Sequence, residues 1–268
     1  EFHKVDKSFG PFDFGECESC GSLFTLNPPS PDRLATFYRS YDDFRPDWYR
    51  SGAAAGALES QYKFYARYVR GTSVDNWVDV GAGHGEIASI VVKDAPHGTA
   101  IDIAPRPSRL PPSVQYFQID MNRDGWAEEV PVRYANVFSV AVLEHVLSPS
   151  AFMRECLSLV APGGQLTMIC PDYSSLARKV LGRSWPYFEP GEHVSVPTKK
   201  GAARCMSEAQ QRLGLAGRVE VKSITVGYSV RYLLEVLRLS AIAAITPPKL
   251  SAPLPTGILS ARFYRDQA

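Results

Sequence analysis

The chain has 268 residues, of which 45% are hydrophobic and 21% are charged, as in an ordinary globular protein. Its formal net charge of +1 supplies no excess of basic residues for a nucleic-acid backbone, and no apolar run is long and uncharged enough to span a membrane. Five cysteines, an odd number, favour a reducing cytoplasm over a disulfide framework, and no signal peptide is visible. The length suits one large domain with at most a small appendage.

The N-terminal region contains a C-x-x-C-G turn, with cysteines at Cys17 and Cys20. Such a turn is half of a zinc-binding site, because structural zinc usually takes four ligands. No second C-x-x-C is present, and His3 is the only nearby candidate for a third ligand. Two free thiols in a loop are an equally good interpretation of this stretch.

Residues 1–50 resemble the small zinc-ribbon leader that precedes some bacterial sugar and natural-product methyltransferases. The resemblance rests on the cysteine pair, an aromatic-apolar strand, two prolines and an F-Y-x-x-Y pattern at Phe37, Tyr38 and Tyr41. It implies a first cysteine pair upstream of Glu1, and therefore zinc in a longer chain. We expect a leader over residues 1–50 and one methyltransferase domain over residues 51–268.

Residues 51–71 are predicted to form a helix, because apolar side chains recur there at helical spacing, Tyr62 and Tyr65 among them. The simplest interpretation is a stripe that faces the core. In the resembling methyltransferases, a tyrosine from this helix often reaches the carboxylate of S-adenosylmethionine (SAM). The resemblance therefore implies that role for Tyr62 or Tyr65.

A short apolar run at residues 77–80 predicts a buried strand, which leads into glycines at Gly81, Gly83 and Gly85. Strand, glycine turn and helix form the first unit of a doubly wound sheet that binds a nucleotide-like ligand. The third glycine comes one residue too early for a dinucleotide fingerprint. The carboxyl group of Asp79, inside the strand end, suits a ligand with a positive charge better than a pyrophosphate.

The pattern D-x-G-x-G-x-G resembles the first motif of the class I SAM-dependent methyltransferases. In that family the glycine turn, here Gly81, Ala82, Gly83 and Gly85, contacts the amino-acid part of SAM. The alternative is a glycine-rich turn without a ligand.

Two more acids follow predicted strands. Asp102 and Ile103 end a strand 21 residues beyond the first glycine, where an acid can accept hydrogen bonds from ribose hydroxyls. A strand over residues 114–119 leads to Asp120 and Met121, and the resemblance implies that the acid bonds the adenine amino group while the methionine packs on the ring.

A fourth strand over residues 137–142 runs into the sequence V-L-E-H-V, and Ser148 with Pro149 then begins a helix. This helix, with Val160 on its inner face, is expected to stop at P-G-G before a fifth strand over residues 165–170. The order of these elements closely resembles the small-molecule branch of the class I methyltransferases. The cofactor site implied by the resemblance includes Val142 and Leu143.

The complete pattern indicates an α/β protein with a doubly wound, Rossmann-like, seven-stranded sheet, whose last strand is antiparallel in this family. A capped helix is predicted over residues 198–213, strands over 219–226 and 257–264, and a proline-rich loop over 247–255. Residues 228–245 are predicted to form an amphipathic helix that packs on the lid or on a second subunit, so a homodimer is a further expectation.

Residues 171–197 form a long, aromatic and irregular segment that leaves the carboxyl end of the fifth strand, where open α/β sheets bind ligands. We expect an inserted lid over the acceptor, and the resemblance implies acceptor contacts for Trp185, Tyr187 and Glu192. A packed surface loop is the alternative.

An acceptor that is not already an anion needs a base, and the residues expected near the pocket are Glu144, His145, Asp172 and His193. A histidine is poised near neutral pH, so it can take a proton from a hydroxyl group or an acidic carbon. The choice between His145 and His193 stays open. The resemblance points to deoxysugar nucleotides, polysaccharide components or antibiotic intermediates as acceptors.

Three other functions fit parts of the sequence. An NAD-dependent oxidoreductase is disfavoured by the early third glycine, and a nucleic-acid methyltransferase by the balanced charge. A catalytically silent SAM-binding partner protein is disfavoured only by the intact motifs.

Overall fold

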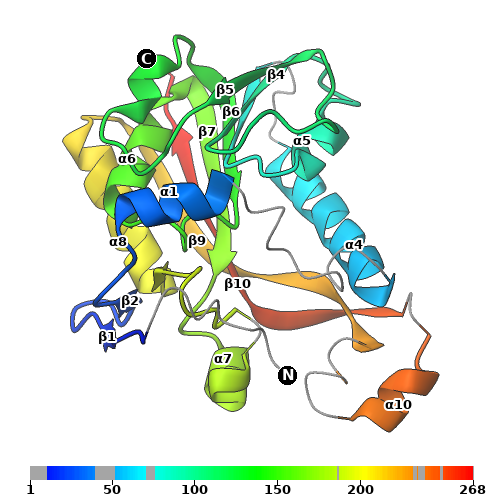
Figure 1. Ribbon diagram of the computed structural model, residues 1–268. Helices are drawn as coiled ribbons and strands as arrows, with labels where there is room; N and C mark the ends of the chain where they lie inside the picture. Colours follow the sequence, from blue (N-terminus) through cyan, green and yellow to red (C-terminus); the bar gives the residue numbers. More distant parts are fainter. Residues whose placement is uncertain are drawn as a thin grey trace.

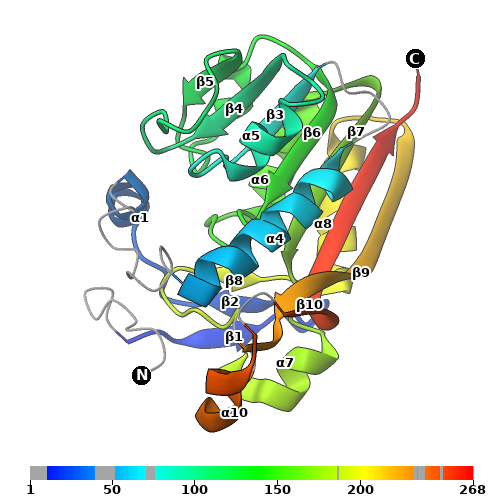
Figure 2. The same ribbon diagram turned by 90° about the vertical axis from the view of Figure 1, so that its right-hand side faces the viewer.

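The computed structural model describes residues 11–39, 52–70, 76–185, 187–231, 234, 239–247 and 250–267. Seven strands form one mixed sheet in the order β5-β4-β3-β6-β7-β10-β9, with helices on both faces (Figures 1 and 2). The strands are β3 (Trp77–Val80), β4 (Gly98–Asp102), β5 (Val114–Gln118), β6 (Tyr134–Val140), β7 (Val160–Pro171), β9 (Gly217–Ser229) and β10 (Ser251–Arg265). The predicted Rossmann-like sheet is confirmed.

The central strands β5, β4, β3, β6 and β7 pair in parallel, while β10 is antiparallel to both β7 and β9. Strand β10 therefore lies between two strands that run in the opposite direction, as predicted for the last strand. All four residues of β3 are buried, because helices cover the parallel part of the sheet on both sides.

Two hydrophobic cores separate the sheet from its helices. One lies under α4 (Gly52–Val69) and α5 (Glu86–Val91) and includes Trp77 and Phe138, whose rings stack at 5.8 Å. The other lies under α6 (Pro149–Ser158) and α8 (Lys199–Arg212), on the opposite side of the sheet in Figure 1. Successive residues of β3 point to opposite faces, so Trp77 enters one core and Val78 the other.

Side-chain caps begin α6 and α8. Ser148 accepts a hydrogen bond from the Ala151 backbone N–H, and Thr198 accepts one from Gly201. Both starts agree with the prediction. The predicted end of α6 is wrong, because the helix stops at Ser158 and Val160 is already in β7. Val160 pairs with Tyr134 of β6, so the backbone at this residue is part of the sheet and no longer of the helix.

The C-terminal region also differs from the prediction. Residues 228–245 do not form one helix: β9 continues to Ser229, the described residues 230, 231 and 234 are helical, and the non-helical residue 239 precedes a separate helix, α10 (Ser240–Ile245). Only the second part of the predicted proline loop is wrong, because β10 begins at Ser251 and pairs with β9 from there onward. A break in register between Leu254 and Ile258 contains Pro255, whereas Pro253 lies opposite Gly227 in the ladder.

A second, three-stranded sheet joins the leader to the lid, in the order β1-β2-β8. Strands β1 (Phe14–Glu16) and β2 (Leu23–Thr25) come from the leader, and β8 (Ser195–Val196) comes from the lid. The rest of the lid carries the short helix α7 (Leu176–Leu181) and the 3-10 turn η3 (Gly182–Ser184). Leader and lid therefore form one layer (Figure 2).

The helix α1 (Pro31–Arg39) follows this small sheet and buries Leu34, Ala35 and Phe37. His3 and Tyr41 of the predicted leader lie outside the described residues. Among the helices that the structure describes, none has an apolar stretch long enough to cross a membrane.

Candidate active site

The glycine turn after β3 adopts backbone conformations that favour glycine. Gly81, Gly83 and Gly85 have φ angles of +79°, +54° and +76°. A Cβ atom on Gly81 would lie 2.2 Å from Cγ2 of Val142, whereas one on Gly83 would meet nothing within 4 Å. The turn thus packs closely against Val142 on one side and leaves space beside Gly83 on the other, where a ligand can approach.

Asp79 lies just before this turn and is 2% exposed. Its Oδ2 atom has no hydrogen-bond partner among the described residues. Burial, and then the charge of Asp102, raise the pKa of Asp79 well above its usual value. A buried carboxyl oxygen without a partner is costly, so this position suits a ligand that brings a positive charge.

Asp102, at the end of β4, shapes the turn directly. Its carboxylate accepts hydrogen bonds from the backbone N–H of Gly83 at 2.8 Å and of Ala104 at 2.9 Å. Burial raises the pKa of Asp102, and these hydrogen bonds oppose the shift. Asp102 and the adjacent buried Ile103 therefore lie at the same edge of the sheet as the glycines. Binding of a ribose by Asp102 stays a prediction.

The other predicted cofactor residues also gather at this edge. Asp120 follows β5 and accepts a hydrogen bond from the Asn122 backbone at 2.9 Å, while Met121 is half-buried against the core. Val142 and Leu143 are buried directly after β6. Because parallel strands end at one edge, these residues share the side on which open α/β sheets bind ligands.

The two predicted tyrosines of α4 lie against the core. Tyr65 is buried in the cluster that contains Ala82 and Ile87, and Tyr62 is partly buried against the same cluster. The stripe that faces the core is thus confirmed, and it brings Tyr65 into the same cluster as Ala82 of the glycine turn. A contact between either tyrosine and SAM stays a prediction.

Three predicted catalytic residues converge where β6 meets the lid. Glu144 and His145 follow β6, and His193 comes from the lid. Their ligand atoms lie within 4.8 Å of one another, and the two imidazole rings meet edge to face at 4.6 Å. Ala141, with a φ of +55°, ends the strand in the left-handed region and turns the chain into this cluster.

Glu144 is the most deeply buried member of the cluster, at 1% exposure, and its Oε2 atom has no hydrogen-bond partner in the described part of the chain. Burial raises the pKa of Glu144 to about 8, so its carboxyl group carries a proton at neutral pH. Its backbone carbonyl accepts hydrogen bonds from Val194 and Ser195, which attach the lid to the turn after β6. Asp172, another predicted base, is also buried, with its Oδ1 held by Ser174.

His193 is held by partners at both ring nitrogens. Its Nδ1 lies 2.8 Å from the carbonyl oxygen of Tyr187, and its Nε2 lies 3.3 Å from Oε2 of Glu189. Burial, and then His145, lower the pKa of His193 well below its usual value, and burial raises the pKa of Glu189 to about 8. At neutral pH a protonated Glu189 can therefore donate to Nε2 of a neutral His193.

His145 is half-buried, and its Nδ1 has two partners. One is the Tyr38 hydroxyl, 2.8 Å away, and the other is the Glu192 carbonyl oxygen, 3.0 Å away. Burial lowers the pKa of His145 to about 4, so the ring is neutral at physiological pH. Nε2 is then the nitrogen that remains to accept a proton from an acceptor molecule.

The cluster could also hold a divalent cation, since two imidazoles and a carboxylate are metal-ligand types. However, both nitrogens of His193 are engaged, Nδ1 by the Tyr187 carbonyl oxygen and Nε2 by Glu189. The described geometry therefore resembles a proton-transfer site more than a site that is ready for a metal.

The residues predicted to contact the acceptor have mainly structural contacts. Trp185 is 1% exposed and packs with Leu23 and Val196 between the leader and the lid. Tyr187 packs edge to face on Trp185 at 5.4 Å and holds His193 through its carbonyl group, while Glu192 holds His145 through its own. Contact of these side chains with an acceptor stays a prediction.

Sequence reasoning missed Glu189 and the contact made by Tyr38. Glu189 lies four residues before His193, and this spacing could have suggested that the two side chains interact. No local pattern in the sequence could have predicted the contact between Tyr38 and His145, because the two residues are 107 positions apart.

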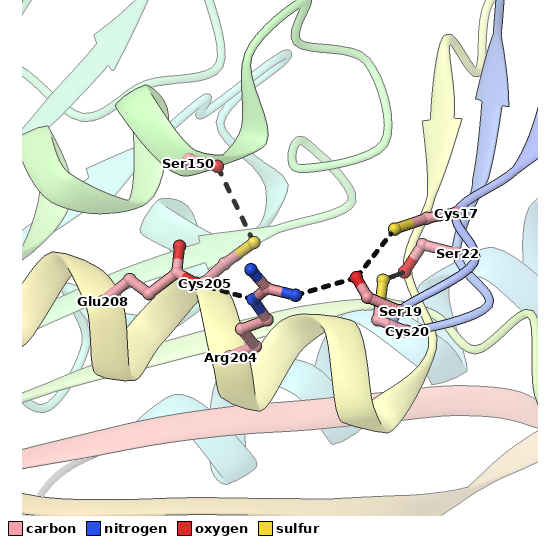
Figure 3. Close-up of polar contacts among 8 residues, drawn as sticks. All are labelled: Cys17, Ser19, Cys20, Ser22, Ser150, Arg204, Cys205 and Glu208. Atoms are coloured by element: carbon pink, nitrogen blue, oxygen red, sulfur yellow. Dashed lines mark hydrogen bonds and ion pairs between the residues drawn. The ribbon is translucent and has the colours of Figure 1, made fainter.

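The cysteine turn is closed by backbone hydrogen bonds. The backbone N–H groups of Cys20 and Gly21 donate to the Cys17 carbonyl oxygen at 3.3 and 2.6 Å. Cys17 Sγ lies 3.2 Å from Ser19 Oγ (Figure 3), and this contact first among several lowers the pKa of Cys17 to about 7. Within the ranges that the structure describes, no third metal-ligating side chain completes this site.

Comparison with known proteins identifies the domain. A family model described as a methyltransferase domain matches residues 52–213. A ubiquinone biosynthesis O-methyltransferase of Xanthomonas euvesicatoria pv. vesicatoria is 35% identical over 95 residues, which are 33% of this chain and 40% of the relative. The relative of Pseudomonas savastanoi pv. phaseolicola is 34% identical over 97 residues. The chain thus spans about two fifths of the length of these relatives.

Two solved structures share the fold. The magnesium protoporphyrin IX methyltransferase of Synechocystis PCC 6803, with bound S-adenosylhomocysteine (SAH), has a TM-score of 0.54 and 13% identity over 88% of this chain and 100% of that one. The plantazolicin methyltransferase in complex with SAH has a TM-score of 0.56 and 14% identity over 88% and 95%. Because the family model covers more than half of the residues, the chain belongs to the methyltransferase-domain family and has the class I fold of the SAM-dependent methyltransferases.

Proposed function

We propose that this chain transfers the methyl group of SAM to a small-molecule acceptor, namely a sugar, a nucleotide sugar or a natural-product intermediate. The main support is that two features lie at the same edge of the sheet: a glycine turn beside a buried carboxyl group whose Oδ2 atom has no partner among the described residues, and a cluster of neutral histidines. The names of the ubiquinone biosynthesis relatives support a hydroxyl oxygen as the methylated atom.

The glycine turn and the acids around it form the SAM site in this proposal. SAM supplies a sulfonium-bound methyl group, which an acceptor atom displaces in line. The open space beside Gly83 lets the amino-acid part of the ligand approach the backbone closely. Asp79, buried and without a partner at Oδ2, balances the positive charge of that part. Asp102 keeps the turn open and faces the ribose.

The base in this proposal is His145. Its Nε2 takes the proton from the acceptor hydroxyl group as the oxygen forms its bond to the methyl carbon. His145 is half-buried, whereas His193 is 7% exposed and engaged at both nitrogens. This difference supports His145 as the base and His193 as a residue that orients the cluster. Much of the rate should come from holding the acceptor in line with the sulfur–methyl bond.

Calorimetric titration with SAH, the stable product, tests the cofactor site. We expect micromolar affinity for the wild type and at least a tenfold loss for Asp102→Ala, equal to about 1.4 kcal/mol. Asp124→Asn, at an exposed turn, is the control and should bind like the wild type. A wild-type chain that binds no SAH would overturn the proposal.

A turnover assay distinguishes a methyltransferase from a protein that binds SAM without catalysing methyl transfer. SAH release is measured against hydroxylated sugars, nucleotide sugars and phenols, with and without EDTA. Release that depends on the acceptor and persists in EDTA supports a histidine base. Loss of turnover in EDTA would contradict that mechanism. Methylation of nucleic acid at low salt would contradict the small-molecule acceptor.

Three finer expectations remain part of the proposal. Zinc binds at Cys17 and Cys20 only in a longer chain, the protein is located in the cytoplasm, and two copies form a homodimer. Sedimentation of the purified chain tests the last of these.

A further inference from the structure

Two short helices expose large apolar side chains at one end of the molecule. In Figures 1 and 2, α7 and α10 are the lowest labelled elements in both views. We propose that this end docks on the surface of an anionic lipid bilayer, with the apolar side chains among the lipids and basic side chains at the head groups. The inference does not depend on the proposed methyl transfer.

The helix α7 has apolar side chains on two faces, and only one face is covered. Ala177 and Leu181 pack against the cluster that contains Trp185 and joins the leader to the lid. Leu176 and Val180, one turn apart on the other face, are 73% and 75% exposed. Packing of the inner face therefore fixes the helix so that the outer apolar face meets solvent.

The helix α10 shows the same feature. Leu239, Ile242 and Ile245 recur every three residues from the start of this helix, so they lie on one side of it. Their exposed fractions are 43%, 51% and 82%, whereas Ala243 is 2% exposed. Scattered apolar residues are normal on a protein surface, but two exposed apolar stripes at one end indicate a contact surface.

Basic residues accompany both stripes. Residues 173–188 and 236–250, which contain the two helices, have five basic residues and no acidic one. The whole chain has 29 basic and 28 acidic residues, which leaves 24 basic and 28 acidic residues elsewhere. Lys179 and Arg183 are exposed and make no ion pair with a described residue, while Arg178 pairs with Glu16. The positive charge is thus concentrated where the apolar stripes are.

This combination selects a bilayer over a second copy of the chain. In a symmetric dimer that paired this end with itself, the basic residues of one copy would face those of the other. An anionic bilayer supplies the opposite charge, and its flat surface can contact two separate helices at once. Apolar side chains flanked by Lys and Arg are the composition that binds to a membrane surface.

Docking would involve the lid directly, because α7 lies within residues 171–197, which also contribute His193. The start of α7 is packed closely on β10: a Cβ atom on Gly257 would lie 2.4 Å from Oγ of Ser175. The docked end is therefore attached both to the lid and to the large sheet.

Vesicle co-sedimentation of the full chain tests the apolar contact. The probe is a vesicle of equal parts phosphatidylglycerol and phosphatidylcholine. We expect the wild type to bind, and the double variant Val180→Ser with Ile245→Ser to lose at least about tenfold in affinity, because two apolar side chains no longer leave water. Val132→Ser is the matched control, since Val132 is also exposed but precedes the amino end of β6, whereas α7 follows the carboxyl end of β7.

Charge variants test the contact with the head groups. Lys179→Gln with Arg183→Gln should weaken binding to the mixed vesicles about tenfold, and added salt should reduce the difference from the wild type. Lys93→Gln with Arg133→Gln removes the same charge from exposed residues that precede β4 and β6, and should bind like the wild type. Because all the replaced side chains are exposed, the variants should fold like the wild type.

Failure of the wild type to bind the mixed vesicles overturns the inference, and so does wild-type affinity in both double variants of this end. Sedimentation velocity then identifies the occupant: a wild-type dimer that Val180→Ser with Ile245→Ser dissociates would show that a second copy covers this end. None of these assays contains SAM, SAH or an acceptor, so their outcome is separate from that of the proposed function.

Discussion

Burial sets the protonation of the side chains at the candidate site. Glu144 and His145 are neighbours in the sequence, yet burial raises the pKa of the acid to about 8 and lowers that of the imidazole to about 4. Both groups are therefore uncharged near neutral pH, because a low-dielectric environment disfavours every charged form. An uncharged cluster allows a hydroxyl acceptor to approach without a competing ion pair.

Glu144→Gln should make the protein relatively more stable as the pH rises. The folded-state pKa of Glu144 lies above its usual value of 4.5, so its contribution to stability is complete below pH 4.5 and is lost as the pH rises toward 8. Glutamine resembles the protonated acid and does not titrate. Between pH 5 and pH 8, the free energy of unfolding of the variant should gain at least ~1.4 kcal/mol on the wild type, which corresponds to one pKa unit.

Urea denaturation at the two pH values measures this difference. Glu128→Gln changes an exposed glutamate and is the matched control, for which no gain is expected. An equal difference between Glu144→Gln and wild type at both pH values would show that Glu144 is ionised in the folded protein.

At the scale of elements, Thr198 links helix α8 to the N-terminal leader, two segments that are far apart in the sequence. Its side chain caps α8 by accepting from Gly201 at 3.0 Å, and its hydroxyl group donates to the Cys20 carbonyl oxygen at 2.6 Å. Its backbone N–H donates to Ser22 at 3.1 Å. The start of α8 is thus also the point where the leader is attached.

Thr198→Val should destabilise the protein and loosen the leader. The variant loses the cap and the bond to the leader, at a cost of about 1–3 kcal/mol. Ser148→Ala removes only the cap of α6 and should cost about 1 kcal/mol. Hydrogen exchange should quicken over residues 14–25 in the first variant alone. Equal protection of this stretch in both variants would show that Thr198 does not hold the leader.

At the scale of the whole molecule, the leader and the lid form one layer over the carboxyl edge of the large sheet. Strands β1 and β2 pair with β8, and Trp185 fills the space between leader and lid. The cysteine turn lies against α8, where Arg204 donates to Ser19 (Figure 3). Zinc at this turn would therefore stiffen the unit that holds Tyr38.

A longer chain, with residues upstream of Glu1, should bind one zinc ion through Cys17 and Cys20, because the described turn supplies only two of the usual four ligands. Metal analysis should find zinc in the longer chain and little in the present one. Cys20→Ser should abolish binding, while Cys205→Ser, which changes the cysteine that contacts Ser150 in α6, should retain it. Equal zinc content in both wild-type chains would contradict the expectation of ligands upstream.

Local patterns in the sequence determined the core of the fold and the edge where the cofactor is proposed to bind. The strand, the three glycines and Asp79 lie within nine residues, and the caps at Ser148 and Thr198 are specified by adjacent residues. Such features are predictable because turns, caps and side-chain periodicity depend on neighbours in the chain.

Only the tertiary structure decided how distant segments complete the site. Pairing of β9 with β10 extends β9 over Tyr228 and Ser229, where a helix was expected, and extends β10 over Ser251–Leu254, where the prolines suggested a loop, because ladder hydrogen bonds and packing outweigh local preference. His193 meets His145 across 48 residues, and Tyr38 meets it across 107. No spacing rule predicts contacts between such distant residues. The sequence therefore indicated both histidines as candidates, but only the tertiary structure shows that Tyr38 of the leader contacts Nδ1 of His145.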